Sequence, residues 1–112
     1  MKDFLYLFKG GDHSTLSPDE MQKHMQEWGA WMENLGKAGK FKGGDPLEDG
    51  GKIVSGKTNK VVTDGPFPEA KELVGGYLIV QAESVGEAAE MAKGCPGLLF
   101  GCTVEVRPIK KM

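Results

Sequence analysis

The sequence predicts an α+β domain, in which one antiparallel sheet carries two helices on the same face. Apolar and aromatic residues run together at residues 3–9 and 76–83, as they do in buried strands. Capping signals open two helices, at Ser17 and at Ser84. The elements then follow in the order strand, helix, strand hairpin, strand, helix, strand. With right-handed crossovers this order gives a ferredoxin-like domain.

The chain has the length and composition of one compact domain. Its 112 residues are 39% hydrophobic and 27% charged, as in an ordinary globular protein. We therefore interpret residues 1–112 as a single domain. A domain of this size buries roughly two-thirds of the surface of its unfolded chain, so a partner that covers an open sheet face would stabilise it.

The sequence patterns that predict secondary structure are clearest for the first strand and the first helix. Residues 3–9 (DFLYLFK) are apolar at nearly every position, as expected for a central strand. In the following SPDE, Ser17 can cap a helix, Pro18 suits its first position and Glu20 can close a capping box. The helix then carries one apolar stripe along about five turns, which must pack on the sheet. The stripe consists of Met21, Met25, Trp28, Met32 and Leu35.

The middle of the chain predicts a loop and then a hairpin. Residues 41–51 (FKGGDPLEDGG) are polar and rich in glycine, and we expect no regular structure there. The segments KIVSG and NKVVTDG flank residues 56–59, which favours a hairpin that supplies the next strands in the predicted order.

The last third of the chain predicts a strand, a helix and a strand. Residues 76–83 (GYLIVQAE) are a strong strand, and Ser84 with Glu87 forms a second capping-box pattern. The helix has a small, alanine-rich inner face. Residues 102–109 (CTVEVRPI) alternate in polarity, as a final strand should.

The two apolar strands have hydrophobic residues on both faces, but two helices cover only one face of the sheet. The other face must then be covered by something else. We expect a homodimer packed sheet to sheet.

The charge of the chain and three of its local features argue against several classes of partner and site. The net charge is −2 and Arg107 is the single arginine, which argues against a nucleic-acid partner. The apolar run at residues 4–8 is too short for a signal sequence or a membrane span, so we expect a cytoplasmic protein with no membrane partner. Cys95 and Cys102 have neither redox nor zinc-finger spacing and are expected to be free thiols.

The two histidines are candidates for acid/base chemistry. His24 lies at the edge of the helical stripe beside Trp28, where partial burial would tune an imidazole for proton transfer. A histidine bonded to a backbone carbonyl at the edge of the core fits the same spacing. His13 lies in a loop after a strand, where it either borders a cleft or is solvated. A metal site would need Asp12, both histidines and a distant carboxylate to converge, so we expect no metal and no cofactor.

Residues 63–78 (TDGPFPEAKELVGGYL) form an unusually elaborate connection. The Asp64-Gly65-Pro66 step is strong turn chemistry, and the segment carries four charged side chains, Asp64 among them. The segment is either a solvated connector or the wall of a pocket. Ordering it would cost about 1–2 kcal/mol of backbone entropy per residue, which favours the pocket wall.

This connection resembles the signature of the DGPF branch of the YCII-related domain family. The segment VTDGPFPEAKELVGGYLIV carries the resemblance, LSPDEMQKHMQEWGAWMENL resembles the family's first helix, and CPGLLFGCTVEVRPI resembles its ending. The resemblance implies a ferredoxin-like domain that dimerises into an α+β barrel. It also implies a histidine on the first helix, matched by His24, paired with an aspartate from an Asp-Pro step. This chain has Cys95-Pro96 at that step. A related member is a dehydrochlorinase acting on a chlorinated hydroquinone.

Three functional hypotheses follow. In the first, the chain is a small enzyme of lyase type acting on a phenolic or anionic compound. His24 is then the general acid/base, Asp64 orients it, and Lys71 holds an anionic group. The proposed pocket is lined by Trp28, Trp31, Phe67 and Tyr77. In the second, the same pocket serves a non-catalytic binding or regulatory module, associated with a sigma factor. In the third, the signature is structural only.

Overall fold

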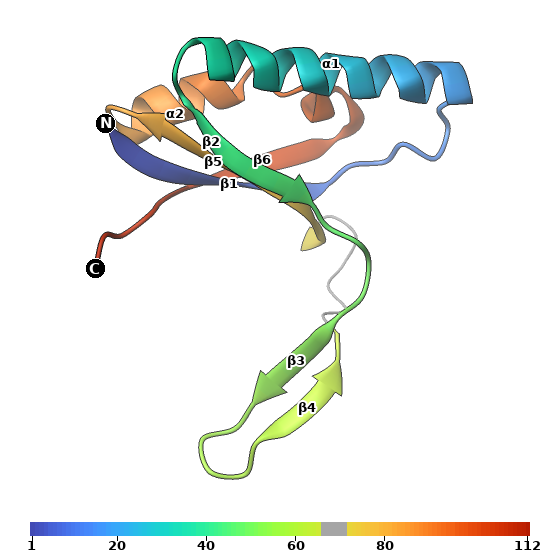
Figure 1. Ribbon diagram of the computed structural model, residues 1–112. Helices are drawn as coiled ribbons and strands as arrows, with labels where there is room; N and C mark the ends of the chain where they lie inside the picture. The colour runs from blue at the N-terminus through green and yellow to red at the C-terminus, as the bar shows by residue number, and fades with distance from the viewer. Residues whose placement is uncertain (66–71) are drawn as a thin grey trace.

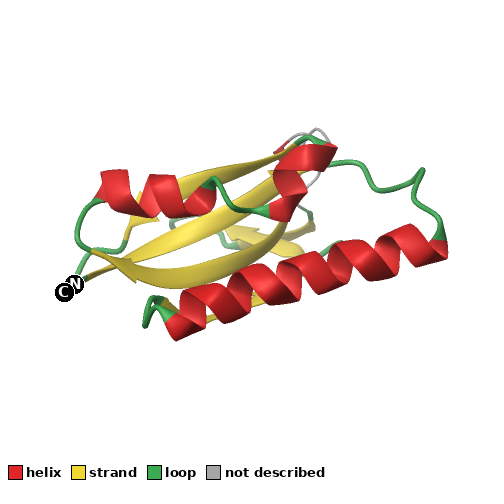
Figure 2. Cartoon of the chain, turned by 90° about the horizontal axis from the view of Figure 1, so that it is seen from above, coloured by secondary structure: helices red, strands yellow, loops and turns green. Residues whose placement is uncertain are grey.

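The computed structural model describes residues 1–65 and 72–112. Its elements are β1 (Lys2–Gly10), α1 (Pro18–Lys37), β2 (Phe41–Pro46), β3 (Lys52–Ser55), β4 (Val61–Asp64), β5 (Val74–Ala82), α2 (Val85–Ala92), the short 3-10 helix η2 (Pro96–Phe100) and β6 (Cys102–Pro108). Within the described residues, β2, β5, β1 and β6 form one antiparallel sheet in that order. Both α-helices lie over the same face of it (Figures 1 and 2). The predicted α+β fold is confirmed, and its strand order is compatible with a ferredoxin-like domain.

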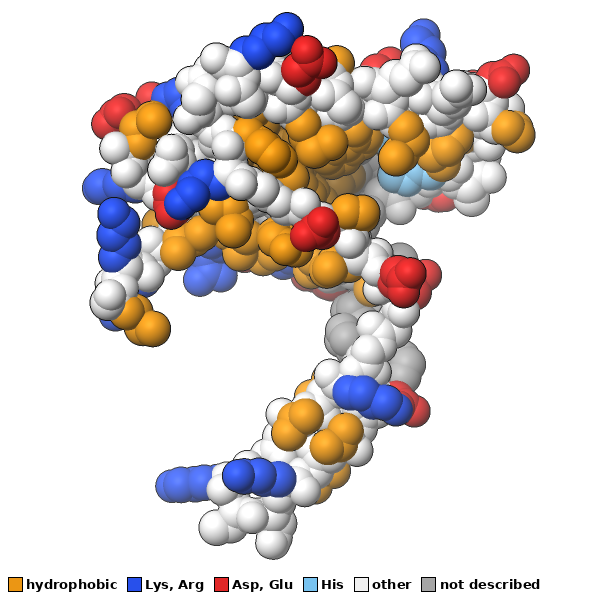
Figure 3. All heavy atoms as spheres, in the orientation of Figure 1, with side chains coloured by type: hydrophobic (Ala, Val, Ile, Leu, Met, Phe, Trp, Pro, Cys, Tyr) orange, Lys and Arg blue, Asp and Glu red, His pale blue; other side chains and the backbone are white. Residues whose placement is uncertain are grey.

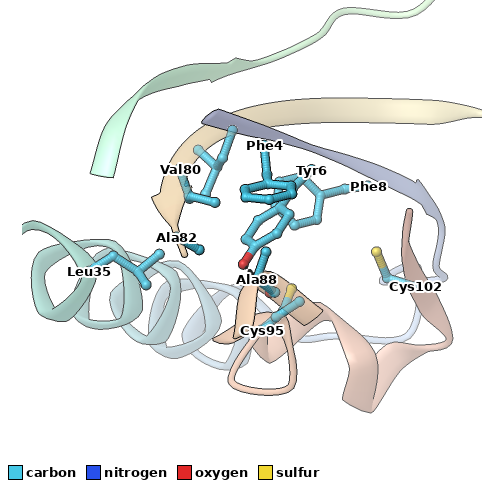
Figure 4. Close-up of a cluster of buried hydrophobic side chains, with 11 residues drawn as sticks. Phe4, Tyr6, Phe8, Leu35, Val80, Ala82, Ala88, Cys95 and Cys102 are labelled. Carbon is cyan, nitrogen blue, oxygen red and sulfur yellow. Dashed lines mark hydrogen bonds between the residues drawn. The ribbon is translucent and has the colours of Figure 1, made fainter. Parts of the chain in front are cut away.

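The core lies between the sheet and the helices. Along β1, every second side chain is buried, so Phe4, Tyr6 and Phe8 face the helices. The Tyr6 hydroxyl donates a hydrogen bond to the carbonyl oxygen of Ala88, at 2.5 Å, and so ties α2 to the central strand. Figure 4 shows these side chains meeting α1 and α2 in one cluster. The buried cluster comprises Phe4, Tyr6, Phe8, Leu35, Leu78, Val80, Ala82, Ala88, Ala92, Cys95 and Cys102.

The helix starts are where their capping signals place them. Ser17 Oγ accepts a hydrogen bond from the Glu20 backbone at 3.2 Å, and Glu20 Oε1 accepts one from the Ser17 backbone at 3.1 Å. Ser84 caps α2 in the same way, from the Glu87 backbone. The Glu87 carboxylate instead pairs with Lys40, at 2.5 Å. The second capping box is therefore only half formed, because a lysine from the connection between α1 and β2 pairs with its carboxylate.

The expectation that residues 41–51 lack regular structure is corrected, because part of this segment forms β2. The strand pairs with β5 at one edge of the sheet, with an irregular register between Phe41 and Gly43. Gly44 permits the pairing: its φ is +154°, and a Cβ there would lie 2.2 Å from the carbonyl oxygen of Tyr77. Gly44 therefore allows a close backbone approach, whereas the sequence pattern alone indicated a loop.

The predicted hairpin forms, but it lies outside the main sheet. β3 and β4 make a separate two-stranded sheet that projects from the body of the molecule (Figure 1). Because β2 occupies the edge beside β5, the hairpin does not pair with β5. Four of its apolar side chains are exposed: Ile53, Val54, Val61 and Val62.

The sheet face opposite the helices is apolar at its centre and charged at its rim. Leu5 and Leu7 on β1, with Ile79 on β5, alternate with the buried residues and are half-buried. At the rim, Lys9 pairs with Glu105 at 2.7 Å. Figure 3 shows hydrophobic side chains along the lower surface of the body, above the hairpin. Sheet-to-sheet dimerisation stays a prediction.

Among the helices of residues 1–65 and 72–112, none combines the length and the apolar character that a membrane span needs.

Candidate functional site

A cavity of about 370 Å³ lies between α1 and the end of the sheet where β1 finishes. This volume suits a small organic ligand. Its apolar lining includes Phe8, Met25, Trp28, Met32, Leu78 and Cys102. His13 supplies an imidazole to the same wall. The site is therefore an apolar cavity with the imidazole of His13 in its wall.

The two histidines of the chain are hydrogen bonded to each other. His13 Nε2 lies 3.1 Å from His24 Nε2, and the indole N–H of Trp28 donates to the same His24 nitrogen at 3.0 Å. Phe100 of η2 packs against both imidazoles, with ring centroids 5.0 Å from that of His13 and 4.6 Å from that of His24. Figure 3 shows a histidine surface beneath α1, bordered by hydrophobic side chains.

The loop that carries His13 is fixed at several points. The Asp12 backbone N–H donates to the carbonyl oxygen of Phe100 at 2.9 Å. The Asp12 carboxylate accepts hydrogen bonds from the Ser14 backbone and hydroxyl, at 2.9 and 2.6 Å, which closes a local turn. Gly11 has a φ of +93° and lets the chain reverse beside Cys102. These contacts hold His13 against η2 and β6.

His24 is held neutral by its surroundings. Its side chain is 5% exposed, and Nδ1 has no hydrogen-bond partner within the described residues. Burial lowers the pKa of His24 below its ordinary 6.5, the nearby His13 lowers it further, and Glu27 acts in the opposite direction. The partners of its Nε2 are side chains, so this is not a histidine bonded to a backbone carbonyl.

The structure brings together only some of the predicted site residues. His24 and Trp28 are in contact, and Trp28 lines the cavity. Trp31 instead stacks on Tyr6 in the core, with ring centroids 6.2 Å apart. Tyr77 borders the cavity, but its position in β5 directs its side chain to the open sheet face, where its hydroxyl donates to Asp45 at 3.1 Å.

Asp64 does not lie beside His24 within the chain, which corrects its expected placement. It ends β4 on the projecting hairpin, where its exposed carboxylate pairs with Lys52 across the two strands. Hairpin pairing fixes it there, because Lys52 and Asp64 are directly opposite in the register. Phe67 and Lys71, the other residues predicted from the same connection, lie outside the described residues.

His13 is the site residue that sequence reasoning left out of the predicted pocket. The available signal was its position in a glycine-flanked loop immediately after a central strand.

Cys95, at the step where the family resemblance implies an aspartate, is buried in the core, and burial raises the pKa of its thiol to about 11. A neutral thiol cannot act as a counter-charge. Among the described residues, no three His, Cys, Asp or Glu side chains are grouped so as to hold a metal ion.

Comparisons with known proteins agree with this fold. The chain is similar in structure to the 5-chloro-2-hydroxyhydroquinone dehydrochlorinase of Burkholderia phenoliruptrix, solved in complex with 2,5-dihydroxybenzoquinone. The TM-score is 0.55 at 20% identity, over 98% of this chain and 95% of that chain. At this identity the likeness shows the fold alone. No curated protein matches the sequence. The family model of the YCII-related domain matches residues 4–112, and the chain therefore belongs to the YCII-related domain family.

Proposed function

We propose that the chain binds a small phenolic compound in the cavity between α1 and the sheet and performs acid/base chemistry of lyase type on it. The observation that carries the proposal is the apolar cavity with an imidazole in its wall that is hydrogen bonded to the buried His24. Apolar walls exclude water and strengthen polar contacts at the imidazole. Trp28 and Phe8 offer aromatic surface against which a phenol ring can pack.

The ligand class rests on the chemistry of this lining and on one comparison. A phenol has an apolar ring for the walls and a hydroxyl proton for an imidazole base. The similar dehydrochlorinase is named for a chlorinated hydroquinone and was solved with a dihydroxybenzoquinone, compounds of the same class. Removal of a hydroxyl proton makes such a ring electron-rich, so that the ring carbon bearing chlorine can take up a proton. The C–Cl bond then breaks, chloride leaves with its electron pair, and loss of the second hydroxyl proton gives a quinone, a net loss of HCl.

A binding and turnover screen tests the proposal. Phenols, hydroquinones and chlorinated hydroquinones would be titrated calorimetrically into the wild type and His24→Gln, and turnover would be followed by absorbance. We expect saturable binding by the wild type and a clear loss of turnover in the variant. Ser55→Ala, on the distant hairpin, is the matched control. Equal binding and turnover in wild type and His24→Gln would exclude the proposed chemistry.

The projecting hairpin favours a second candidate, a non-catalytic module that binds a small molecule and contacts another protein. A two-stranded hairpin is only marginally stable alone in water, and this one exposes Val54 and Val62 as a cross-strand pair. Such a surface is suited to a protein contact, for which a sigma factor is our candidate. Retained function in His24→Gln, together with loss of function in Val54→Lys, would favour this alternative.

We also propose that the chain forms a homodimer through the open sheet face. Its support is the apolar centre of that face, with Leu5, Leu7 and Ile79 surrounded by charged residues. An apolar centre with a polar rim is the usual composition of a protein interface.

A further inference from the structure

We infer that Trp28 and His13 donate hydrogen bonds that converge on His24. In this relay, His13 exchanges the proton with a ligand in the cavity and His24 is a positioning residue. The role toward a ligand rests on the proposed function. The direction of each hydrogen bond is independent of the proposed function, because it follows from hydrogen-bond chemistry alone.

The indole of Trp28 sets the direction. An indole N–H can only donate, so His24 Nε2, 3.0 Å away, must accept and carries no proton. His13 Nε2, 3.1 Å from the same atom, must therefore donate to it, because two nitrogen lone pairs would repel at this distance. One acceptor thus holds two donors. The proton of neutral His24 is consequently on Nδ1.

His24 is poorly placed to exchange a proton with the cavity. Its Nε2 lone pair is shared by the two donors, and its Nδ1 is buried without a partner in the described part of the chain. His13 is the histidine that lines the cavity. A buried polar atom left unpaired is destabilising, which is expected where a ring orientation is kept for function. Here the orientation keeps Nε2 available as an acceptor for His13.

His13 is left with one free acceptor. Its Nε2–H is committed to His24, and its Nδ1 has no hydrogen bond within residues 1–65 and 72–112. In the proposed step, the O–H bond of a phenol breaks, a bond forms between that proton and Nδ1, and the electron pair stays on the phenolate oxygen. His13 becomes an imidazolium whose Nε2–H bond to His24 is then charge-assisted and stronger. The reverse step returns the proton to the ligand.

Charged and titratable groups face the two imidazoles from the loop, from α1 and from β6. Asp12 precedes His13 in the loop and is bonded to Ser14, and Glu27 acts on His24 from α1. From β6, the Cβ of Cys102 lies against Gly11 of the loop, and burial raises the pKa of the Cys102 thiol, which is therefore neutral. From η2, the contacting side chain is Phe100, which does not titrate. Because Nε2 of His13 is committed to His24, the ligand that suits the Nδ1 acceptor is a neutral hydroxyl donor.

Nitrogen-15 NMR of the imidazoles tests the direction directly, because the chain has two histidines and His13→Gln assigns both. At pH 8 we expect the Nε2–H tautomer for His13 and the Nδ1–H tautomer for His24. Trp28→Phe should abolish the single tautomer of His24, because the donor that fixes it is gone, whereas Trp31→Phe should leave it unchanged. An Nε2–H tautomer of His24 in the wild type would overturn the relay, whether or not Trp28→Phe folds.

Turnover of a phenol found by the screen tests the assignment of roles. We expect His13→Gln to lower kcat by about 10²- to 10⁴-fold with KM changed by less than about threefold. His24→Leu should lower kcat less than His13→Gln does and should shift the pH profile, because leucine offers no acceptor to stabilise the imidazolium. A larger loss of kcat in His24→Leu than in His13→Gln would overturn the assignment. If no phenol binds, the proposed function fails, and the tautomers still decide the relay.

Discussion

At the scale of single residues, the buried polar groups of this protein are held by long-range contacts. His24 meets His13 from the loop after β1, and Tyr6 on β1 meets the backbone of α2. Each such contact joins two elements, so a change at one residue affects the packing of both. Two predictions concern these residues.

The first prediction concerns pH and His24. Since burial lowers the pKa of His24 in the folded state below 6.5, the unfolded state binds more protons as the pH falls below that value. The free energy of unfolding should therefore be highest above about pH 6.5 and decrease as the pH falls toward the folded-state pKa. Urea unfolding at pH 7.5, 6.5 and 5.5 measures this slope. His24→Gln should flatten it in this range, and an unchanged slope in that variant would contradict the prediction.

The second prediction concerns the hydroxyl of Tyr6. The side chain is fully buried, and its hydroxyl donates to the Ala88 carbonyl. Tyr6→Phe should lower the free energy of unfolding by about 1–2 kcal/mol, because a buried hydrogen bond is lost. Tyr77→Phe is the control, since the bond of Tyr77 to Asp45 is exposed, and it should change stability by less than about 0.5 kcal/mol. Equal effects in urea unfolding would argue against the structural role of Tyr6.

At the scale of elements, the edge strand β2 decides where the hairpin and the cavity lie. It pairs with β5 through a glycine segment, and Gly44 and Pro46 border the cavity. The hairpin follows it, beyond the end of the sheet. A single strand with weak sequence signals therefore positions both the candidate site and the projecting surface.

The third prediction concerns Gly44. An alanine there would place its Cβ 2.2 Å from the Tyr77 carbonyl oxygen and 2.6 Å from Leu78 Cδ2. Gly44→Ala should therefore lower the free energy of unfolding by about 1–3 kcal/mol, through overpacking and a strained φ. Gly29→Ala is the matched control: nothing lies within 4 Å of its added Cβ in α1. That control should stabilise the protein by up to about 1 kcal/mol. Equal melting temperatures would contradict the role given to β2.

At the scale of the whole molecule, the chain is more extended than a compact domain of its length. Its radius of gyration is 16.0 Å, against roughly 13 Å expected from the usual scaling. The hairpin projects on one side, and the open sheet face lies bare beside it (Figures 1 and 3). Both features leave apolar side chains in water, and a second copy of the chain would cover the sheet face.

The fourth prediction tests the dimer. Sedimentation of the wild type should give a dimer at micromolar concentration. Ile79→Glu, at the centre of the open face, should give a monomer, because burying an unpaired carboxylate in an apolar interface is unfavourable. Leu99→Glu is the control, since Leu99 lies on η2, on the helix side, and is 80% exposed. It should leave the dimer intact. A stable wild-type monomer at this concentration would remove the proposal.

The local signals of the sequence determined the helices and the central strands. Ser17 and Ser84 cap helices where predicted, since a capping side chain acts on backbone groups two or three residues away. The apolar runs at residues 3–9 and 76–83 likewise predicted the central strands β1 and β5. Helix starts and apolar strands depend on residues that are neighbours along the chain, and so they can be predicted from the sequence.

Only the tertiary structure decided β2, the separate hairpin and the contact between His13 and His24. A glycine segment has no side-chain pattern, and whether it forms a loop or a strand depends on whether β5 offers a free edge. Asp64 faces Lys52 because of the hairpin register, and His13 reaches His24 because its loop is anchored on η2, far along the chain. Such contacts join residues that are distant in sequence, and their free energy exists only once the chain has folded.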